Sequence, residues 1–341
     1  MSLLHLRLHV PGLLEMPRAA LRDAPAVPAL ERLLAHASRR VLPFAGERGD
    51  LAVLFGLSSE SARVLSMAAC LCAARGFDTG DGWLCADAVH LRAEAGTLRL
   101  FGPGVLAVSE AERDALAAGF EAAFAAEGYR LHPVGLARWL LRVPHRFDVR
   151  LADTAAVHGR DVLAFMPQGP DGAHIAAFLN EVQMLWHEHP VNTAREAQGL
   201  PAINGLWLWG EGEEQGMPHR TDCVTAWTDD PLCAGAARRL GAEVRPGVRT
   251  CAEWLARAMP GVHVVSAGDL CPAALRGDAT SWQTEVERLE RDWFAPAAAA
   301  LAAGKLKVLE LCLGGEVAYR VTRPRLWQFW RRPRSLAERL S

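Results

Sequence analysis

The chain has 341 residues, of which 50% are hydrophobic and 22% are charged, and its formal net charge at pH 7 is −2. This composition is typical of a globular protein with a sizeable core, and the small net charge excludes a global attraction to nucleic acid or to anionic membranes. The apolar runs are too short, or too often interrupted by charges, to cross a bilayer. The eight cysteines contain no CxxC pair, and the N-terminus lacks the pattern of a signal peptide. We therefore expect reduced cysteines and a cytoplasmic protein.

The first half of the chain combines strand and helix patterns. Residues 3–10 alternate apolar and polar side chains, which predicts a strand that ends at Pro11-Gly12, and helical periodicity predicts helices over 28–37 and 58–74. We interpret residues 77–150 as an inserted α+β domain. Its predicted elements are strands over 83–85, 89–93, 98–101, 129–132 and 139–143, and a helix over 109–126 that begins with a capping box.

The second half alternates strands and helices, which favours a mainly parallel sheet covered by helices. We therefore expect an α/β core domain made of residues 1–76 and 151–341. Its sheet should contain residues 3–10, 205–209, 223–227 and 262–266. The expected helices and turn lie at 175–187, 230–240, 251–258 and 281–302, and at the hairpin turn Gly314-Gly315.

Residues 180–212 are the densest stretch of unusual residues. Pro190 ends the preceding helical run, and Asn192 can cap a second short helix. The apolar run Leu206–Trp209 is typical of a buried strand. Gly210 and Gly212 then allow a tight turn or a close approach to a ligand.

This stretch resembles the signature of the archaeal-type, cofactor-independent phosphoglycerate mutases of the alkaline phosphatase superfamily. The resemblance implies a shortened alkaline phosphatase-like fold. A closer resemblance, over most of the chain, is to shorter bacterial proteins described as RpfE-type regulatory proteins, through Ala88–Leu91, Asn180–Met184 and Phe329–Arg332. The positions that match the mutase signature are His189, Pro190, Asn192, Arg195, Gly199, Pro201, Ala202, Asn204, Trp207 to Gly210, and Gly212.

The resemblance also implies a site with two metal ions and a hydroxyl nucleophile, because the mutases have an Asp after the first strand and a later Asp-x-x-x-His. Here the first strand ends in His9-Val10-Pro11-Gly12, where the family has Asp-Gly. Asp269 matches the later Asp, but residue 273 is alanine, and no histidine follows His263. Losing metal ligands is costly for phosphoryl transfer. We therefore expect no metal cofactor, with Asp269 as a relic; Mn or Zn ions are the alternative.

Within the signature, we predict that His189, Asn192, Arg195, Asn204, Gly210 and Gly212 form a ligand-binding site. Arg195 is the main candidate, since guanidinium suits phosphate and carboxylate groups and a helix N-terminus favours anions. The alternative is a structural role for Arg195, in an internal salt bridge or in bonds to loop carbonyls. His5 and His9 share a face of the first strand, and we interpret them as structural.

The C-terminal run Arg320–Arg334 is basic and aromatic and contains no acid. Such a run can bind single-stranded nucleic acid through charge and stacking. We favour the interpretation that its aromatic side chains pack on the domain while its arginines stay solvated, so we do not expect nucleic acid as a partner.

From the sequence, the function that we expect is a non-catalytic regulatory or anion-binding protein on a degenerate mutase scaffold, with no catalytic residues. A phosphorylated or carboxylate small molecule and a protein are the expected partners, and no membrane is expected. One alternative is an active metal-dependent phosphoglycerate mutase or phosphatase. A weaker alternative is a nucleic-acid-binding regulator.

Overall fold

A computed structural model describes residues 4–17, 25–42, 44, 46–78, 82–94, 96–212, 220–328 and 330–340. The chain divides into two compact units, which we describe separately. Unit 1 comprises Met1–Arg63 and Pro218–Ser341, and unit 2 comprises Val64–Met217.

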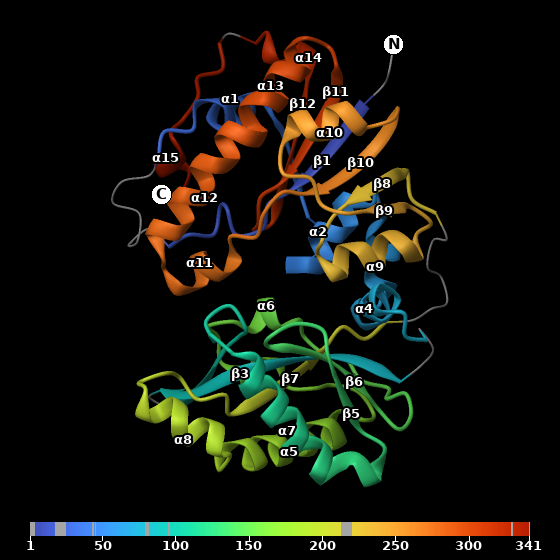
Figure 1. Ribbon diagram of the computed structural model, residues 1–341, viewed down its shortest axis with the longest axis vertical. Helices are drawn as coiled ribbons and strands as arrows, with labels where there is room; N and C mark the ends of the chain where they lie inside the picture. Colours follow the sequence, from blue (N-terminus) through green and yellow to red (C-terminus); the bar gives the residue numbers. More distant parts are fainter. Residues whose placement is uncertain are drawn as a thin grey trace. The chain divides into compact units, whose positions relative to one another are not determined.

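Unit 1 is built on a mainly parallel sheet with the strand order β2-β12-β11-β1-β10-β8-β9, seven strands within the described residues (Figure 1). Strand β1 lies between β10 and β11 and is parallel to both, while β12 and β2 are antiparallel at one edge. The strands are β1 (Leu4–His9), β2 (Ser38–Val41), β8 (Cys223–Trp227), β9 (Glu243–Arg245), β10 (Gly261–Ser266), β11 (Leu306–Cys312) and β12 (Val317–Thr322).

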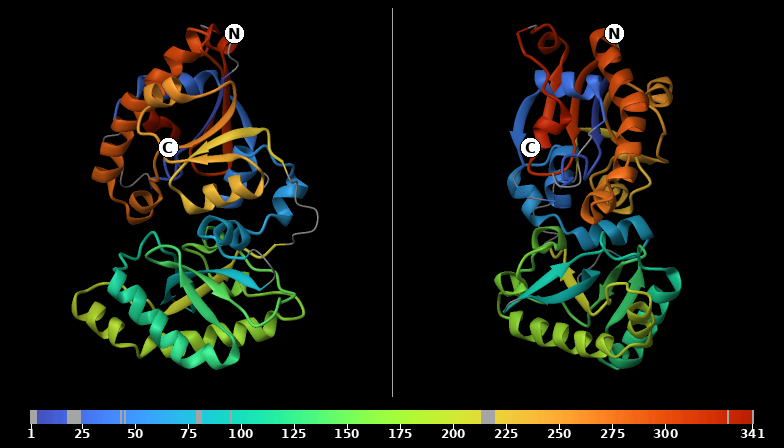
Figure 2. Two further views of the ribbon diagram at one scale, coloured as in Figure 1. Left: turned by 45° about the vertical axis from the view of Figure 1, so that its right-hand side comes forward. Right: turned by 90° about the vertical axis from the view of Figure 1, so that its left-hand side faces the viewer.

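Helices cover both faces of this sheet. Leu6 and Leu8 of β1 face a core that includes Leu33 of α1, Trp254 of α10 and Trp282 of α12, and the long helical run after β10 stands along this face (Figure 2). Helix α2 contacts β1 and β11, and helix α9 contacts β8 and β9. Neither contributes a residue to that core, because both cover the opposite face. The helices are α1 (Pro28–His36), α2 (Gly46–Leu54), α3 (Ser59–Val64), α9 (Pro231–Arg239), α10 (Cys251–Arg257), α11 (Cys271–Arg276), α12 (Ala279–Leu289), α13 (Ala295–Ala302), α14 (Arg323–Leu326) and α15 (Leu336–Leu340).

The expected helix over 281–302 contains a π-helical turn, η4 (Glu290–Phe294), between α12 and α13. The cause is Pro296, which has no N–H for a helical bond and whose ring crowds the preceding turn. A π-bulge relieves this conflict without ending the helix. The hairpin at Gly314-Gly315 is confirmed, and both glycines have positive φ, but its connection runs over residues 313–316 instead of two residues.

Unit 2 is an antiparallel sheet backed by helices. Its long strand β3 pairs with β4 through one half, and with β6 and β7 through the other half; β5 adds beyond β6. Helices α5 and α7 share one core with the sheet. The elements are α4 (Met67–Arg75), β3 (Trp83–Glu94), β4 (Thr97–Phe101), α5 (Glu110–Phe124), η2 (Ala125–Glu127), β5 (Arg130–Pro133), β6 (Arg138–Arg142), α6 (Thr154–Val157), η3 (Val162–Phe165), α7 (Gly172–His187), α8 (Pro190–Ala197) and β7 (Gly205–Trp209).

The expected α/β class with a mostly parallel sheet is confirmed, but the division of the chain differs from the expected one. The second unit runs over 64–217 instead of 77–150. Strand β7, which we assigned to the parallel sheet, pairs antiparallel with β3 in unit 2. Its residues are all buried, and α7 packs against it. The sequence of such an apolar strand does not indicate to which sheet the strand belongs. None of the helices within the described residues is long and apolar enough to cross a bilayer.

Candidate functional site: the carboxyl end of strand β1

The alternating sequence of β1 separates its side chains onto two faces. Leu4, Leu6 and Leu8 face the apolar core. His5, Arg7 and His9 occupy the alternate positions, and the latter two bond residues of α2 on the other face. A row of basic side chains therefore runs beneath α2 and ends at the carboxyl edge of the sheet, where α/β proteins usually bind their ligands.

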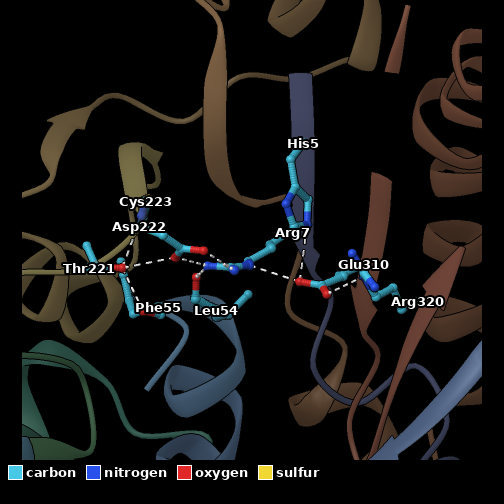
Figure 3. A network of polar contacts seen from close by, with 9 residues as sticks. All are labelled: His5, Arg7, Leu54, Phe55, Thr221, Asp222, Cys223, Glu310 and Arg320. Atoms are coloured by element: carbon cyan, nitrogen blue, oxygen red, sulfur yellow. Dashed lines mark hydrogen bonds and ion pairs between the residues drawn. The ribbon is translucent and has the colours of Figure 1, made fainter. Parts of the chain in front are cut away.

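Arg7 holds the centre of this row through a network of ion pairs (Figure 3). Its two terminal nitrogens donate to the two carboxylate oxygens of Asp222 at 2.6 Å each, and its Nε donates to Oε2 of Glu310 at 2.9 Å. Nη1 also donates to the carbonyl of Leu54 at 3.0 Å. Burial alone would lower the pKa of Arg7, but the bonds and charges of the two carboxylates raise it. The guanidinium is therefore a fixed, buried cation.

Glu310 on β11 joins three basic side chains. His5 Nε2 lies 3.2 Å from Oε2, which also accepts from Arg7, and Arg320 Nε lies 3.2 Å from Oε1. Burial would raise the pKa of Glu310, but the hydrogen bond from His5 and the charge of Arg7 outweigh it and lower the pKa to about 2. Glu310 is thus ionised and internally neutralised.

His9, at the end of β1, pairs with Asp50 of α2. Its Nε2 lies 3.3 Å from Oδ2 of Asp50, and both side chains are 9% exposed. Burial disfavours the charged imidazole, but the hydrogen bond and charge of Asp50, together with the charges of Asp230 and Asp269, raise the pKa of His9. The carboxyl end of β1 therefore favours an imidazolium surrounded by carboxylates.

The carboxylates around His9 follow three neighbouring strands and are bound to backbone amides. Asp230, after β8, caps α9 by accepting from the amide of Leu232 at 2.7 Å. Asp269, after β10, accepts from the amide of Cys271 at 2.9 Å. Glu15, after β1, accepts from the amide of Gly315 at 2.7 Å. Each carboxylate therefore has a local structural bond that competes with a metal ion for the same oxygen.

The loop after β1 lies directly against the loop after β10. Gly12 has φ +81°, and a Cβ there would lie 2.2 Å from the amide nitrogen of Cys271, so any other residue would displace this backbone. Burial and the charges of Asp50 and Asp269 raise the pKa of Glu15, against the opposing hydrogen bonds from Gly315 and Cys271. Close packing of two loops thus brings acidic groups to the edge of one sheet.

These residues do not fit the two-metal centre that the family resemblance implies. Among the residues that the structure describes, no three His, Cys, Asp or Glu side chains are grouped so that they could hold one metal ion. Asp269, the residue expected as a relic ligand, does lie at the carboxyl edge, as a metal ligand of that family would. The histidine at the end of β1, His9, has its Nε2 facing Asp50.

Arg195, the centre of the site predicted from the sequence, lies inside unit 2 and is only 1% exposed. Its Nε donates to the carbonyl of Pro201, and its Nη1 donates to the carbonyl of Ala107 and to Oε1 of Glu112 at 2.8 Å. Its Nη2 has no hydrogen-bond partner. This is the internal salt bridge that we considered as the alternative, and an external anion would have to compete with these bonds.

Asn192 and His189 have structural roles that differ from those expected. His189, not Asn192, caps α8, since its Nδ1 accepts from the amide of Val191. The Asn192 side chain joins the end of α7 to the segment before β7, by donating to the carbonyls of Trp186 and Ile203 and accepting from the amide of Ile203. Pro190, the first residue of α8, has no backbone N–H and is favoured at the first helical position, so the capping residue is the one before it, His189.

The remaining signature residues hold the edge of β7. Asn204 pairs with the backbone of Leu91, accepting from its amide at 2.7 Å and donating to its carbonyl at 2.9 Å. Gly210 has φ +80°, and a Cβ there would lie 2.7 Å from Cys85 Sγ. A Cβ on Gly212 would lie 2.6 Å from the backbone of Ser66. Both glycines therefore allow close packing between elements of unit 2, and the ligand-binding role of these residues stays a prediction.

Burial makes several cysteine thiols of unit 1 less acidic than usual. All eight cysteines of the chain are free. Burial raises the pKa of Cys223 to about 11 and that of Cys251 to about 12, so both stay protonated at neutral pH.

Sequence reasoning missed most of the residues that meet at the end of β1. We noted that His5 and His9 share a face, but we gave no role to Arg7, Asp50 or Glu310. The signal was present: a strand whose polar positions are all basic requires acidic partners if it lies inside a sheet. The positions of those partners could not be predicted, since Glu310 lies more than 300 residues further along the chain.

Three comparisons bear on this fold. A scan of protein-family models found no match. The chain is 34% identical over 62 residues to a 2,3-bisphosphoglycerate-independent phosphoglycerate mutase from Methanothrix thermoacetophila, and 29% identical over 56 residues to one from Methanosarcina mazei. These stretches cover 18% and 16% of this chain, and only 16% and 14% of the two mutases. The chain is therefore similar to cofactor-independent phosphoglycerate mutases over a short segment.

A solved structure, that of the PH0037 protein from Pyrococcus horikoshii, matches over 94% of this chain and 88% of its own, with a TM-score of 0.55 and 14% sequence identity. At that identity the match shows a shared fold and nothing of function. The fold likeness extends over nearly the whole chain, whereas the sequence similarity to the mutases is local.

Proposed function

We propose that this chain is a non-catalytic regulatory or ligand-binding protein that keeps a phosphoglycerate mutase-like scaffold. The observation that supports the proposal most strongly is the His9–Asp50 pair at the carboxyl end of β1. The resemblance places a metal-ligating Asp just beyond this strand. Here the imidazole of His9, 3.3 Å from Asp50, stands at the end of the strand instead.

This replacement supports the proposal that the chain does not carry out two-metal phosphoryl transfer. In that reaction two cations orient and neutralise the attacking and leaving oxygens together. A single imidazole supplies at most one positive charge, and its Nε2 faces Asp50. One oxygen of each carboxylate, Oδ1 of Asp230 and of Asp269, accepts from a backbone amide of the helix that follows. The arrangement stabilises the loops at the sheet edge without presenting a nucleophile and its activating ions.

The regulatory part of the proposal is supported by the resemblance to RpfE-type proteins at Ala88–Leu91 and Asn180–Met184. The ligand class is supported by the mutase relatives, whose name specifies a phosphoglycerate. We therefore propose a phosphorylated or carboxylate small molecule as the ligand. A protein is the second candidate partner.

A mutase and phosphatase assay tests the non-catalytic part directly. The purified chain is incubated with 3-phosphoglycerate and with p-nitrophenyl phosphate in the presence of Mn²⁺, Co²⁺ or Zn²⁺. We expect no turnover above that of a protein-free control. Turnover that a chelator abolishes, and that Asp269→Asn abolishes while Asp278→Asn leaves unchanged, would establish the alternative of an active metal-dependent enzyme. Asp278 is a suitable control because its carboxylate only caps α12.

A further inference from the structure

One edge of unit 1 gathers arginines from both ends of the chain. Strand β2 is the last strand at this edge, and its Arg39 and Arg40 are exposed. It pairs with β12, so that Ser38 lies opposite Arg320, which is also exposed. Strand β12 leads directly into α14 and the C-terminal segment. Two sequence segments about 280 residues apart thus form one surface.

The C-terminal segment is held on this edge by its own arginines. Arg325 Nε donates to the carbonyl of His36 at 2.8 Å, and Arg331 Nη1 donates to the carbonyl of Ala35 at 3.2 Å. Both carbonyls belong to the last turn of α1, where the helix dipole favours a positive charge. These contacts bring further arginines next to β2. We call this edge of the sheet the arginine edge: Arg39, Arg325 and Arg331 lie on its α1 side, Arg320 lies on its α2 side beside Glu310, and the edge also includes Arg40, Arg323, Arg332 and Arg334.

The arginine edge carries little neutralising charge. Residues 317–335 contain no aspartate or glutamate, and Glu310, which pairs with Arg320, is shared with Arg7 and His5. Burial lowers the pKa of the neighbouring Arg339, and the charges of Arg334 and Arg39 lower it further, against the opposing charges of Tyr319 and Glu31. The chain as a whole has a net charge of −2. The positive potential is therefore a local property of this edge.

Two tryptophans lie exposed among these arginines. Trp327 is 70% exposed and Trp330 is 65% exposed, so the interpretation that the aromatic side chains of this run pack on the domain is wrong for both. Phe329 lies outside the described residues. Tryptophans elsewhere in the described chain are among the largest fully buried side chains, including Trp227, Trp254 and Trp293. The indoles at this edge are thus set apart from those that build the core.

We propose that the arginine edge, with Trp327 and Trp330, is a docking surface for single-stranded nucleic acid. Guanidinium groups match the phosphate backbone through paired N–H donors, and exposed indoles provide faces on which unpaired bases stack. A purely acidic polymer such as polyglutamate would use the arginines but would have no flat group to stack on the two indoles. A duplex would also use only the arginines, because its bases are already stacked on one another.

Fluorescence anisotropy of a short labelled oligothymidine tests the proposal with the full-length protein. We expect saturable binding at low salt that weakens as salt rises, with a logarithmic slope of about −0.7 for each phosphate contacted. Replacing both indoles (W327A/W330A) should weaken binding at least about fivefold, since stacking contributes to binding at each base. The variant R39A/R40A/R332A should weaken binding more and should also reduce the salt slope. The matched control R63A/R238A/R276A removes the same charge from exposed arginines elsewhere in unit 1 and should bind as the native chain does.

Several outcomes would overturn the proposal. The first is the absence of binding by the folded native chain at low salt and micromolar protein. The second is equal weakening of binding by R39A/R40A/R332A and by the control R63A/R238A/R276A, which would show an effect of overall charge. The third is binding that survives W327A/W330A unchanged, or that a duplex or polyglutamate of equal charge matches, which would show a partner recognised by charge alone. Thermal melts of each variant, with midpoints equal to that of the native chain, ensure that a loss of binding is not a loss of folding.

Discussion

Arg7 and Asp222 form a two-pronged ion pair, 2.6 Å at each contact, between residues 215 positions apart in the sequence. The Arg7 side chain is buried, with 7% of its surface exposed, and its guanidinium also donates to the carbonyl of Leu54. Leu54 precedes the segment 64–217 that forms unit 2, and Asp222 follows it. One buried side chain of β1 therefore bonds, within unit 1, to a residue that precedes the segment 64–217 and to one that follows it.

We predict that Arg7→Met destabilises unit 1 by about 2–4 kcal/mol, measured by urea unfolding. Removing one partner of a buried ion pair leaves the other charges uncompensated, and this costs about 3–5 kcal/mol. The figure is reduced here because the Asp222 side chain is 52% exposed. Arg320→Met is the matched control: it also contacts Glu310, but its side chain is 54% exposed, so its loss should cost less than about 1 kcal/mol. Equal effects of the two substitutions would contradict the central role of Arg7.

Glu310 should make the free energy of unfolding depend on pH in the acidic range. Its pKa is lowered from 4.5 to about 2, so its ion pairs contribute stability that is fully present above pH 4.5 and is lost as the pH falls toward 2. At full size the shift corresponds to about 3 kcal/mol. The difference in unfolding free energy between the native chain and Glu310→Gln should therefore shrink as the pH falls from 5 to 2.5. Glu316→Gln, at an exposed position, should show no such trend.

His9 should titrate above the ordinary histidine pKa. Because its pKa is raised in the folded state, the stability it contributes is fully present below about pH 6.5 and is lost as the pH rises through the folded value. An NMR titration of its imidazole should give a midpoint above 6.5 that falls in Asp50→Asn. His263 provides an internal contrast, since burial lowers its pKa and its midpoint should lie below 6.5. A His9 midpoint below 6.5 would contradict the raised pKa of His9.

Arg195 provides a test of the anion site predicted from the sequence. Because its guanidinium is buried and bonded to Glu112 and to two carbonyls, Arg195→Ala should lower the stability of unit 2 by about 2–4 kcal/mol. Glu112→Gln is the matched comparison: glutamine still completes the capping box with Ser109 but carries no charge, so its cost should be smaller. In thermal shift assays, millimolar 3-phosphoglycerate should affect the native chain and Arg195→Ala alike. Stabilisation of the native chain alone would support the anion site instead.

Local patterns predicted most elements, because hydrophobic periodicity and capping residues are encoded within a few positions. The strand ending at His9, the capping box at Ser109 and the hairpin at Gly314 all occur. Patterns could not assign β7 to its sheet, since a strand buried on both faces has the same sequence in either one. The single helix expected over 58–74 is two helices, because Ser66 caps a new one by accepting from the amide of Ala69.

The candidate site was harder to predict than the fold, because its residues meet only through topology. Asp50, Asp230 and Asp269 come from three separate loops or helices, and of these only Asp269 matches a motif of the mutase family. The mutase signature directed attention to Arg195, whose internal bonds are visible only once α5 and α8 are packed in one unit. The arginine edge is similar, since Arg39 and Arg40 become neighbours of the C-terminal run only when β2 pairs with β12.

The central claim is that His9, paired with Asp50, stands at the end of β1 in place of metal ions. Binding of Mn²⁺ to the purified chain, followed by the EPR signal of the free ion, tests it most directly. The account predicts that micromolar Mn²⁺ gives the signal of the free ion whether or not an equal concentration of protein is present. Stoichiometric loss of the free-ion signal, restored by Asp269→Asn but not by Asp278→Asn, would show a metal centre at this edge and would contradict the account.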